Sequence, residues 1–475
     1  MSLRSSVVFK GFWVCLAVLL MIFNAYATPV TISNGIQFKD TSGNIIHAHG
    51  GGVIKVGSDY YWFGENRNSN DTFYAVSCYR STDLKTWEFR NNVLTQYSNS
   101  DLSSAKIERP KVIYCANTGK YVMWMHKENA GDYGQARAAV AVSSTVDGNY
   151  SYLGSFRPLN YMSRDCTLFV DTDGSAYFLS AANENADLHM YKLSSDYQSI
   201  ASLVQKLFVG QSREAPCLFK RNGYYILITS GCTGWTPNQQ KYAYATSMSG
   251  SWSGLTNIGN STCYSSQGTY VLPVQGSSTT SYLFMADRWA GASGGKANDS
   301  AYVWLPLSFN SNTLLTMNWY DPISIDTATG TITGTIPTYY KIKNKNSGKL
   351  ADVNGGSLAD GTKIIQWPDN GGDNQRWQLI DAGSGYYKIK NKKSAKLMDV
   401  SDGSTANSAQ IVQMADNGSD SQLWQRIDAG LGYYKLRNKK SGMLLEVNGY
   451  STADGANITQ YPDNGGANQQ WQIVQ

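Results

Sequence analysis

One pattern of hydrophobic and polar positions occurs five times between residues 30 and 330. Each copy has a short apolar run, a turn, and then a strand rich in aromatic residues; these strands follow Gly57, Gly119, Gly174 and Gly223, and the last begins at Ser281. Short aromatic runs bounded by turn residues are typical of β-strands. The copies are unevenly spaced, but their number predicts a five-bladed β-propeller, in which antiparallel sheets surround a central axis.

A second repeat, with a constant period, occupies residues 339–475. Its copies are 47 residues apart, and each contains Tyr-Tyr-Lys, Leu-x-(Asp/Glu)-Val and a Gln-x-Trp-Gln segment with Trp377, Trp424 or Trp471. A unit of this length cannot bury its apolar face alone, so three copies must close on one another. Three copies of about four short strands predict a β-trefoil, with the three tryptophans in its core.

Composition agrees with an all-β chain of more than one domain. The 475 residues include 32 Tyr, 13 Trp and 45 Gly, which favours short strands and turns over helices. We therefore predict a five-bladed β-propeller over residues 28–326, a linker rich in threonine and glycine over 327–338, and a β-trefoil over 339–475.

The N-terminus has the pattern of a cleavable secretory signal over residues 1–27. A charged start with Arg4 and Lys10 precedes an apolar run over 12–23 and the small-residue site Ala25-Tyr-Ala27. The alternative is a membrane anchor, but this run is shorter than the about 20 residues that a spanning helix needs. We expect a secreted, extracellular protein that is not held in a membrane. Six cysteines remain after the signal and permit disulfides, but their pairing does not follow from the sequence.

The charge of the chain and the spacing of its potential metal ligands argue against a nucleic-acid partner and against a metal site. The net charge is only +5, and Lys341, Lys388 and Lys435 are spaced by the repeat, which indicates a solvated strand edge and not a nucleic-acid surface. His47 and His49 lack a third ligand nearby, and no Cys-x-x-Cys pair exists, so we expect no metal and no cofactor. We expect a monomer.

A polar residue stands just before the first strand of each of the five copies: His49 or its neighbours, Glu108, Asp165, Glu214 and Gln267. Each lies 11 to 15 residues before the aromatic strand of its copy, so the five are equivalent in position. The first strands of propeller blades line the axis, so these side chains should converge there. Crowded carboxylates raise one another's pKa, as a general acid requires near neutral pH. Alternatively, each carboxylate caps a turn or pairs with its neighbouring Arg109, Arg164 or Arg213.

Two of these segments, Ser-Arg-Asp165-Cys-Thr-Leu-Phe and Arg-Glu214-Ala-Pro-Cys-Leu-Phe, resemble the two best motifs of glycoside hydrolase family 43. The resemblance covers residues 30–330 and implies a five-bladed propeller and an inverting enzyme. It implies that Glu214 is the general acid that protonates the leaving oxygen. Asp165 would be the carboxylate that tunes the pKa of this acid and orients the sugar.

The first copy departs from the family pattern. The usual general base is an Asp ten residues before the first Tyr of its strand, and here that position is Gly50. This loss, together with His-Ala-His-Gly-Gly-Gly, Tyr-Trp-Phe-Gly-Glu65 and Ser-Gln267-Gly-Thr-Tyr, resembles the exo-β-1,3-galactanase branch of the family. Inversion needs a water opposite the acid, with about 6.5–9.5 Å between the two groups. Gln267, as an amide or an imidic acid, is the candidate that holds this water, and Glu108 is a base or a sugar ligand.

Other binding residues follow from the loops and from the second repeat. Glu65, Tyr133 and Trp235 are candidates at the rim, where Trp235 either stacks on galactose or packs within its glycine-rich loop. Residues 339–475 resemble the ricin B-type lectin, or family 13 carbohydrate-binding module, in which an acid, an aromatic platform and an Asn bind sugar. Copy one matches with Asp352, Trp367 and Asn374, and copy three with Glu446, Tyr461 and Asn468. Copy two keeps Asp399 but has Met414 and Ser421, so it lacks the platform.

These features together predict an exo-acting hydrolase that releases galactose from β-1,3-galactan, the backbone of arabinogalactan, with inversion. The lectin-like module would hold the enzyme on this polysaccharide. One alternative is an α-L-arabinofuranosidase or β-xylosidase of the same family, against which the Gly50 departure counts. Another is a non-catalytic galactan-binding lectin whose propeller has lost its chemistry with its base.

Overall fold

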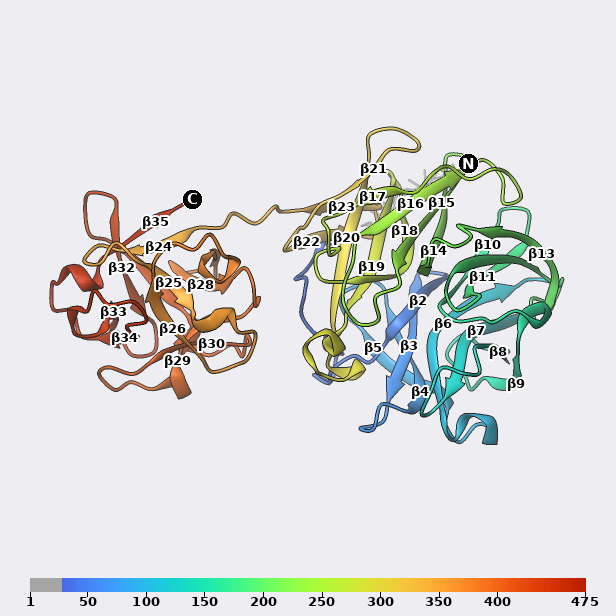
Figure 1. Ribbon diagram of the computed structural model, residues 1–475, viewed down its shortest axis with the longest axis horizontal. Helices are drawn as coiled ribbons and strands as arrows, with labels where there is room; N and C mark the ends of the chain where they lie inside the picture. Colours follow the sequence, from blue (N-terminus) through green and yellow to red (C-terminus); the bar gives the residue numbers. More distant parts are fainter. Residues whose placement is uncertain (1–27) are drawn as a thin grey trace, which may run out of the picture.

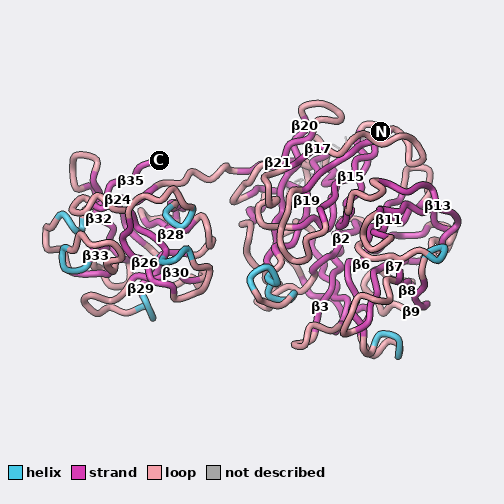
Figure 2. The backbone as a smooth tube through the Cα atoms, viewed as in Figure 1, coloured by secondary structure: helices cyan, strands magenta, loops and turns pink. Residues whose placement is uncertain are grey.

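The computed structural model describes residues 28–475, and the expected signal peptide, residues 1–27, lies outside the described residues. The described part is all-β and forms two lobes that a single extended segment joins (Figure 1). Its helices are short 3₁₀ turns (Figure 2), and none of those in residues 28–475 has the length and apolar character needed to span a bilayer. They are η1 (Ser100–Leu102), η2 (Pro158–Asn160), η3 (Ala290–Ser293), η4 (Ala297–Asp299), η5 (Asn354–Gly356), η6 (Asp373–Gln375), η7 (Ser401–Gly403), η8 (Asp420–Gln422), η9 (Asn448–Tyr450) and η10 (Ala467–Gln469).

Five four-stranded antiparallel sheets follow one another along the larger lobe, each made of strands that are consecutive in sequence. Their strands are β2 (His49–Val56), β3 (Asp59–Arg67), β4 (Phe73–Ser81) and β5 (Glu88–Thr95); β6 (Ala105–Cys115), β7 (Lys120–Asn129), β8 (Arg137–Ser143) and β9 (Ser151–Phe156); β10 (Cys166–Val170), β11 (Ala176–Ala182), β12 (Asp187–Leu193) and β13 (Ile200–Leu207); β14 (Arg213–Arg221), β15 (Tyr224–Gly231), β16 (Gln240–Ala245) and β17 (Thr256–Ile258); and β18 (Gln267–Gln275), β19 (Thr280–Arg288), β20 (Ala301–Phe309) and β21 (Leu315–Met317).

The first strands of these sheets form a closed ring. β2 contacts β6, β6 contacts β10, β10 contacts β14, β14 contacts β18, and β18 contacts β2 again. The second strands are covered on both faces: in β15, the six residues from Tyr225 to Ser230 are all buried. This burial explains why the aromatic strands read as continuous apolar runs and not as alternating ones.

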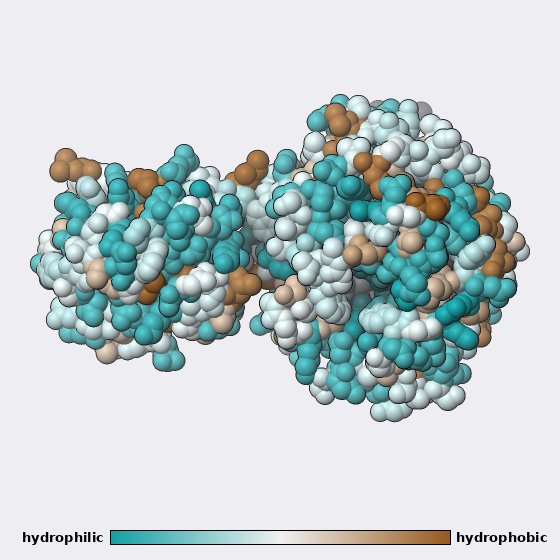
Figure 3. All heavy atoms as spheres, in the orientation of Figure 1, coloured by the Kyte–Doolittle hydropathy of each residue, from teal (hydrophilic) through white to brown (hydrophobic). Residues whose placement is uncertain are grey.

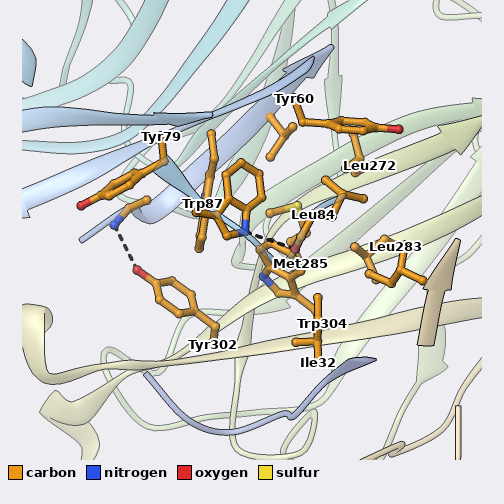
Figure 4. Close-up of a cluster of buried hydrophobic side chains, with 14 of the residues drawn as sticks. Ile32, Tyr60, Tyr79, Leu84, Trp87, Leu272, Leu283, Met285, Tyr302 and Trp304 are labelled. Atoms are coloured by element: carbon orange, nitrogen blue, oxygen red, sulfur yellow. Dashed lines mark hydrogen bonds between the residues drawn. The ribbon is translucent and has the colours of Figure 1, made fainter. Parts of the chain in front are cut away.

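An aromatic cluster packs the first sheet against the fifth (Figure 4). Trp62 of β3, Trp87 before β5 and Trp304 of β20 are each at most 2% exposed. The ring centroid of Trp62 lies 5.2 Å from that of Trp87 and 5.0 Å from that of Trp304. The Ala48 amide donates a hydrogen bond of 3.0 Å to the Tyr302 hydroxyl. Burial of each such side chain contributes at least about 2 kcal/mol, so this cluster holds the ring closed.

A three-stranded sheet ties the beginning of the larger lobe to its end. It pairs β1 (Val30–Ile32) with β22 (Ile323–Asp326), and β22 with β23 (Thr331–Gly334). Residues 331–334 belong to the segment expected to be a linker, yet they form a strand. The reason is that Ile332 packs against the aromatic cluster, which offsets the flexibility of the neighbouring glycines.

The smaller lobe is one sheet of twelve short strands that repeat every 47 residues. The expected core position of the tryptophans is confirmed: all three are 0% exposed, and their indole N–H groups donate to backbone carbonyls of Ala351, Met398 and Leu445. The strands are β24 (Lys341–Asn344), β25 (Leu350–Val353), β26 (Thr362–Trp367), β27 (Trp377–Asp381), β28 (Tyr386–Asn391), β29 (Leu397–Val400), β30 (Ile411–Met414), β31 (Trp424–Asp428), β32 (Tyr433–Asn438), β33 (Leu444–Val447), β34 (Ile458–Tyr461) and β35 (Trp471–Val474).

The surface of both lobes is mainly hydrophilic on the face that Figure 3 shows, with hydrophobic residues in scattered places. Single aromatic side chains stand out from this polar surface, and Trp235 and Trp367 are 38% and 40% exposed. Cysteine does not cross-link the described residues, because all six of their cysteines are free thiols and only Cys232 is not fully buried. The stability of the larger lobe therefore rests on its cores and sheets.

Candidate active site

A β-bulge follows the polar residue at the start of four of the five first strands. The strand register shifts after His49, Glu108 and Glu214, and again after Gly268. The residue after the polar one has a left-handed backbone in three of these strands, with φ of +60° at Gly50, +53° at Arg109 and +52° at Ala215. Bulges bend a strand and re-aim its side chains, so they turn these polar groups toward the end of the ring.

The structure brings all seven site residues predicted in the larger lobe to one pocket. Its volume is about 330 Å³. The lining residues are the predicted Glu65, Glu108, Tyr133, Asp165, Glu214, Trp235 and Gln267, joined by Arg67, Arg109, His126, Arg164, Asn185, Cys232, Gly234 and Trp289. Residues separated by more than 200 positions therefore meet because the first strands close into a ring.

Glu214 has the properties of an acid that is protonated near neutral pH. Burial raises the pKa of its carboxyl to about 7, and the negative charge of Asp165 adds to this rise against the opposing charge of Arg109. One oxygen, Oε1, accepts a hydrogen bond of 3.0 Å from Gln267 Nε2. The group is thus held in place and retains its proton at a pH where an exposed glutamate has lost it.

Arg109 connects three parts of the pocket, although sequence reasoning treated it only as a partner for its neighbour Glu108. Its Nε lies 2.9 Å from Asp165 Oδ2, and its terminal nitrogens donate to the Gly268 carbonyl and, at 2.6 Å, to Gln267 Oε1. Asp165 also accepts a hydrogen bond of 3.1 Å from the Ala215 amide, next to Glu214. Asp165 and Gln267 are therefore both fixed by one guanidinium.

Glu108 departs from the expectation that crowding raises the pKa of every carboxylate here. Burial opposes its ionisation, but the hydrogen bond from His126 and the charge of Arg67 outweigh burial and hold its pKa well below the usual range. Oε1 accepts from Arg67 (2.8 Å) and Tyr133 (2.7 Å), and Oε2 lies 3.1 Å from His126 Nδ1. His126 in turn contacts the buried Glu128 at 2.9 Å. Glu108 is thus an anion whose oxygens are already engaged.

Glu65 occupies the space beside the position where the family's base is missing. A Cβ atom at Gly50 would lie only 2.6 Å from Glu65 Oε1. Burial raises the pKa of Glu65 to about 7, even though Arg67 donates two hydrogen bonds, of 2.9 and 2.6 Å, to its Oε2. A residue with a Cβ atom at position 50 would therefore have to displace this carboxyl group, which comes from β3.

Both ends of the Gln267 amide form hydrogen bonds. Oε1 accepts from Arg109 and, at 2.8 Å, from Trp289 Nε1, while Nε2 donates to Glu214 and, at 2.9 Å, to Ser230 Oγ. Gln267 therefore contacts the acid directly at 3.0 Å, closer than the about 6.5–9.5 Å that leaves room for a water in inverting enzymes. Inversion with Gln267 as the water-holder requires the two side chains to separate when substrate enters.

The sequence pattern did not predict three functional neighbours: Arg67, His126 and Trp289. The signal for Arg67 was available, because it lies two positions after Glu65 and so shares a face of the same strand. His126 stands opposite Glu108 in the β6–β7 pairing, which no spacing rule revealed. Trp289 lies outside the repeated strand and had no such signal.

One group of side chains has the spacing of metal ligands. Ligand atoms of Glu108, His126 and Asp165 lie within 4.8 Å of one another. Arg67 and Arg109 already pair with the two carboxylates, and the two glutamates beside His126 overcome its burial and raise its pKa to about 9. The three groups are therefore members of one network of ion pairs.

The smaller lobe places the predicted sugar-binding side chains in two similar sites. Asp352 is buried and accepts from Gln375 (2.8 Å), Asn374 donates to the neighbouring Val353 carbonyl (3.3 Å), and the exposed Trp367 ends the paired strand β26. Glu446 accepts from Asn468 (3.1 Å) and Gln469 (3.2 Å) on the copy that carries Tyr461. Copy two keeps the bond from Gln422 to Asp399 (3.0 Å) but presents Met414 in place of the aromatic residue. The acids thus share one hydrogen-bonding arrangement, whereas the platforms differ.

Two parts of the chain match known families. Residues 49–269 match the glycosyl hydrolases family 43, and residues 330–414 and 416–475 match the ricin-type beta-trefoil lectin domain-like family. A β-xylosidase from Bacillus subtilis (strain 168) is 25% identical over 198 residues, which are 38% of this chain and 35% of that enzyme. The chain thus spans about a third of this curated relative.

Two solved structures resemble almost the whole chain. An exo-β-1,3-galactanase from Clostridium thermocellum is 56% identical, with 94% of this chain and 99% of that chain covered and a TM-score of 0.65. An exo-β-1,3-galactanase from Phanerochaete chrysosporium, solved with β-1,3-galactotriose, is 28% identical, with 94% and 92% covered and a TM-score of 0.63. The sheets and the carboxylate pocket thus define a glycoside hydrolase joined to a lectin-like domain. The chain belongs to glycosyl hydrolase family 43.

Proposed function

We propose that this protein is a secreted exo-β-1,3-galactanase that releases galactose from β-1,3-galactan with inversion. The observation that carries the proposal is the pocket in which Glu214, with a pKa of about 7, stands beside Asp165 and Gln267. The similarity to an exo-β-1,3-galactanase over 99% of that chain supports the substrate. Glu214 donates the proton to the leaving oxygen, Asp165 holds the acid protonated, and Gln267 positions the water after it parts from Glu214.

The proposal also includes the domain architecture and the export of the protein. The closed ring of five sheets supports a five-bladed β-propeller over residues 28–326, and the 47-residue repeat supports a β-trefoil over 339–475 that binds the polysaccharide. The proposed signal over 1–27 exports a protein that acts as a monomer outside the cell and is not held in a membrane. Protein recovered from the culture medium of an expressing cell should then begin at Thr28, as N-terminal sequencing would measure.

Product analysis tests the activity. Purified protein is mixed with β-1,3-galactan, and the products are followed by NMR; the proposal expects galactose, released first as the α-anomer. Galactose that appears first as the β-anomer, or no galactose at all, contradicts it. Replacing Glu214 by Gln removes the acidic proton and should lower kcat by a factor of about 10²–10⁴ while the protein stays folded.

A second substrate is worth a parallel test because of the similarity to a β-xylosidase. Chromogenic α-L-arabinofuranoside and β-xyloside are offered beside galactan at equal concentration. If either chromogenic substrate is hydrolysed faster than galactan, the protein is an α-L-arabinofuranosidase or a β-xylosidase, as in the wider family. Retention on galactan with no hydrolysis of any of the three identifies a non-catalytic lectin.

A further inference from the structure

The segment over residues 289–299 lies between β19 and β20, and its first residue, Trp289, lines the pocket. It contains η3 and η4 and is anchored on the first sheet. Asn298 Nδ2 donates to Asn66 Oδ1 (3.0 Å) and to the Arg67 carbonyl (2.9 Å), and its Oδ1 accepts from the Arg67 amide (3.1 Å). Lys296 Nζ donates to the Ser69 carbonyl at 2.6 Å. The 289–299 segment is therefore held against the strand that carries Glu65 and Arg67.

Trp289 joins this segment to Gln267. Its indole is 8% exposed, and Nε1 donates the 2.8 Å bond that fixes Gln267 Oε1. The other donor to this oxygen is Arg109. Both partners are donors, so together they fix which end of the amide faces them and which end faces Glu214. Loss of the indole N–H leaves the amide held on that side by Arg109 alone.

Gly291 joins the same segment to Trp235. A Cβ atom at Gly291 would lie 2.7, 2.8 and 3.0 Å from Cγ, Cδ2 and Cδ1 of the Trp235 indole. The backbone of Gly291 lies outside the left-handed region, so the need for glycine comes from space and not from φ. Trp235 also meets Trp289 edge-on at 5.2 Å between ring centroids. The indole of Trp235 is thus seated against the backbone of residue 291 and the ring of residue 289.

We propose that the 289–299 segment sets both the specificity and the geometry of the pocket, with Gly291 and Trp289 as positioning residues. Gly291 seats the exposed Trp235 ring, which stacks on the substrate sugar. Trp289 orients the Gln267 amide. This inference rests on the proposed galactanase function.

Gly291→Ala tests the first half. The new methyl meets the indole and displaces it, so KM for a β-1,3-galacto-oligosaccharide should rise about tenfold, as the loss of one aromatic contact implies, with kcat within about twofold. Gly254→Ala is the matched control, because a Cβ there meets nothing within 4 Å and the backbone also lies outside the left-handed region. An unchanged KM in a folded Gly291→Ala protein overturns the role of Gly291.

The Trp235→Ala background shows whether Gly291 acts through Trp235. Adding Gly291→Ala to Trp235→Ala should change KM no further, because the indole that the methyl meets has gone. If Gly291→Ala alone lowers Tm strongly, the double variant should restore it. A KM effect of equal size in both backgrounds, or no recovery of Tm, contradicts the proposal.

Trp289→Phe tests the second half. It keeps an aromatic side chain but removes the indole N–H, so kcat should fall about tenfold while KM stays near that of the wild type. A fall in Tm with kcat unchanged would assign Trp289 a packing role only and overturn this part.

Wild-type protein and Gly254→Ala are assayed in parallel. If neither hydrolyses galactan, the proposed function fails. Activity in both, with no change in the segment variants, refutes only the positioning roles.

Discussion

Neighbouring carboxyl groups in the pocket differ in protonation because each has a different set of partners. Burial raises the pKa of Glu214 and of Glu65 to about 7. Glu108 is just as buried, but His126 and Arg67 hold its pKa well below the usual range. The pocket thus contains a protonated acid and a fixed anion close together, which is the separation of roles that acid catalysis needs.

Activity should depend on the proton of Glu214. Since the acid must be protonated, kcat/KM should fall as the pH rises through about 7. Asp165→Asn removes the negative charge that favours the proton and leaves Arg109 uncompensated, and both changes lower the pKa of Glu214. The alkaline limb of the pH profile should therefore move to lower pH. The exposed Asp402→Asn serves as a control and should leave the profile in place; a shift of the limb to higher pH with Asp165→Asn contradicts the assignment.

We expect Arg67 to stabilise the fold strongly, because one side chain forms several ion pairs. Its side chain is 3% exposed and pairs with Glu65, Glu108 and Asp71. Arg67→Met removes the ion-pair partner of the buried Glu65 and one of the partners of Glu108, so the free energy of unfolding should fall by about 3–5 kcal/mol in denaturant titrations. Arg90→Met removes an exposed pair with Glu88 and Asp147 and should cost under about 1 kcal/mol. Equal losses for both variants would contradict this view of the pocket.

The strand that begins each sheet is the element that delivers a side chain to the pocket. The spacing of polar residues ahead of the aromatic strands predicted four of these side chains correctly as neighbours, because one residue per first strand is a local pattern. The bulges were not predicted, since a left-handed residue such as Arg109 or Ala215 carries no sequence signal. The bulges explain why Arg109 turns to Asp165 and not to Glu108.

Gly50→Asp, which places the family's usual aspartate at position 50, should not increase activity. Gly50 has a φ of +60°, and any Cβ there meets Glu65 Oε1 at 2.6 Å. Gly50→Asp adds this clash and a second carboxylate beside Glu65, so both Tm and kcat should fall below those of the wild type. Gly50→Ala separates the two causes, because it brings the clash without the charge. A gain in kcat with Gly50→Asp would show that position 50 still accepts a base.

At the scale of the whole molecule, two lobes with different repeats are joined in one chain. Beyond the extended segment they meet at a buried ion pair, in which Lys390 Nζ of the smaller lobe lies 2.6 Å from Asp321 Oδ2 of the larger lobe. The larger lobe carries the pocket with the carboxyl groups. The smaller lobe carries a buried acid in each copy and an exposed aromatic residue, Trp367, in copy one, which suits it to hold a polysaccharide.

The smaller lobe should bind through copy one and not through copy two. Trp367→Ala removes the exposed platform beside Asp352 and should weaken retention on immobilised β-1,3-galactan about tenfold, with kcat on a short oligosaccharide unchanged. Met414→Ala is the equivalent change in copy two and should have little effect. Equal retention of both variants in affinity electrophoresis would exclude copy one as the main site.

The all-β class, both repeats, the buried tryptophans of the smaller lobe and the residues that open the first strands follow from the sequence alone. They do so because strand periodicity and constant spacing are local properties of the chain. The tertiary structure decided the rest: the partners of Glu108, the carboxyl of Glu65 beside Gly50, and the contacts of Trp289 with Gln267 and of Gly291 with Trp235. These groups are brought together only when the five first strands close into a ring, so burial and charge, and with them protonation, depend on residues distant in sequence.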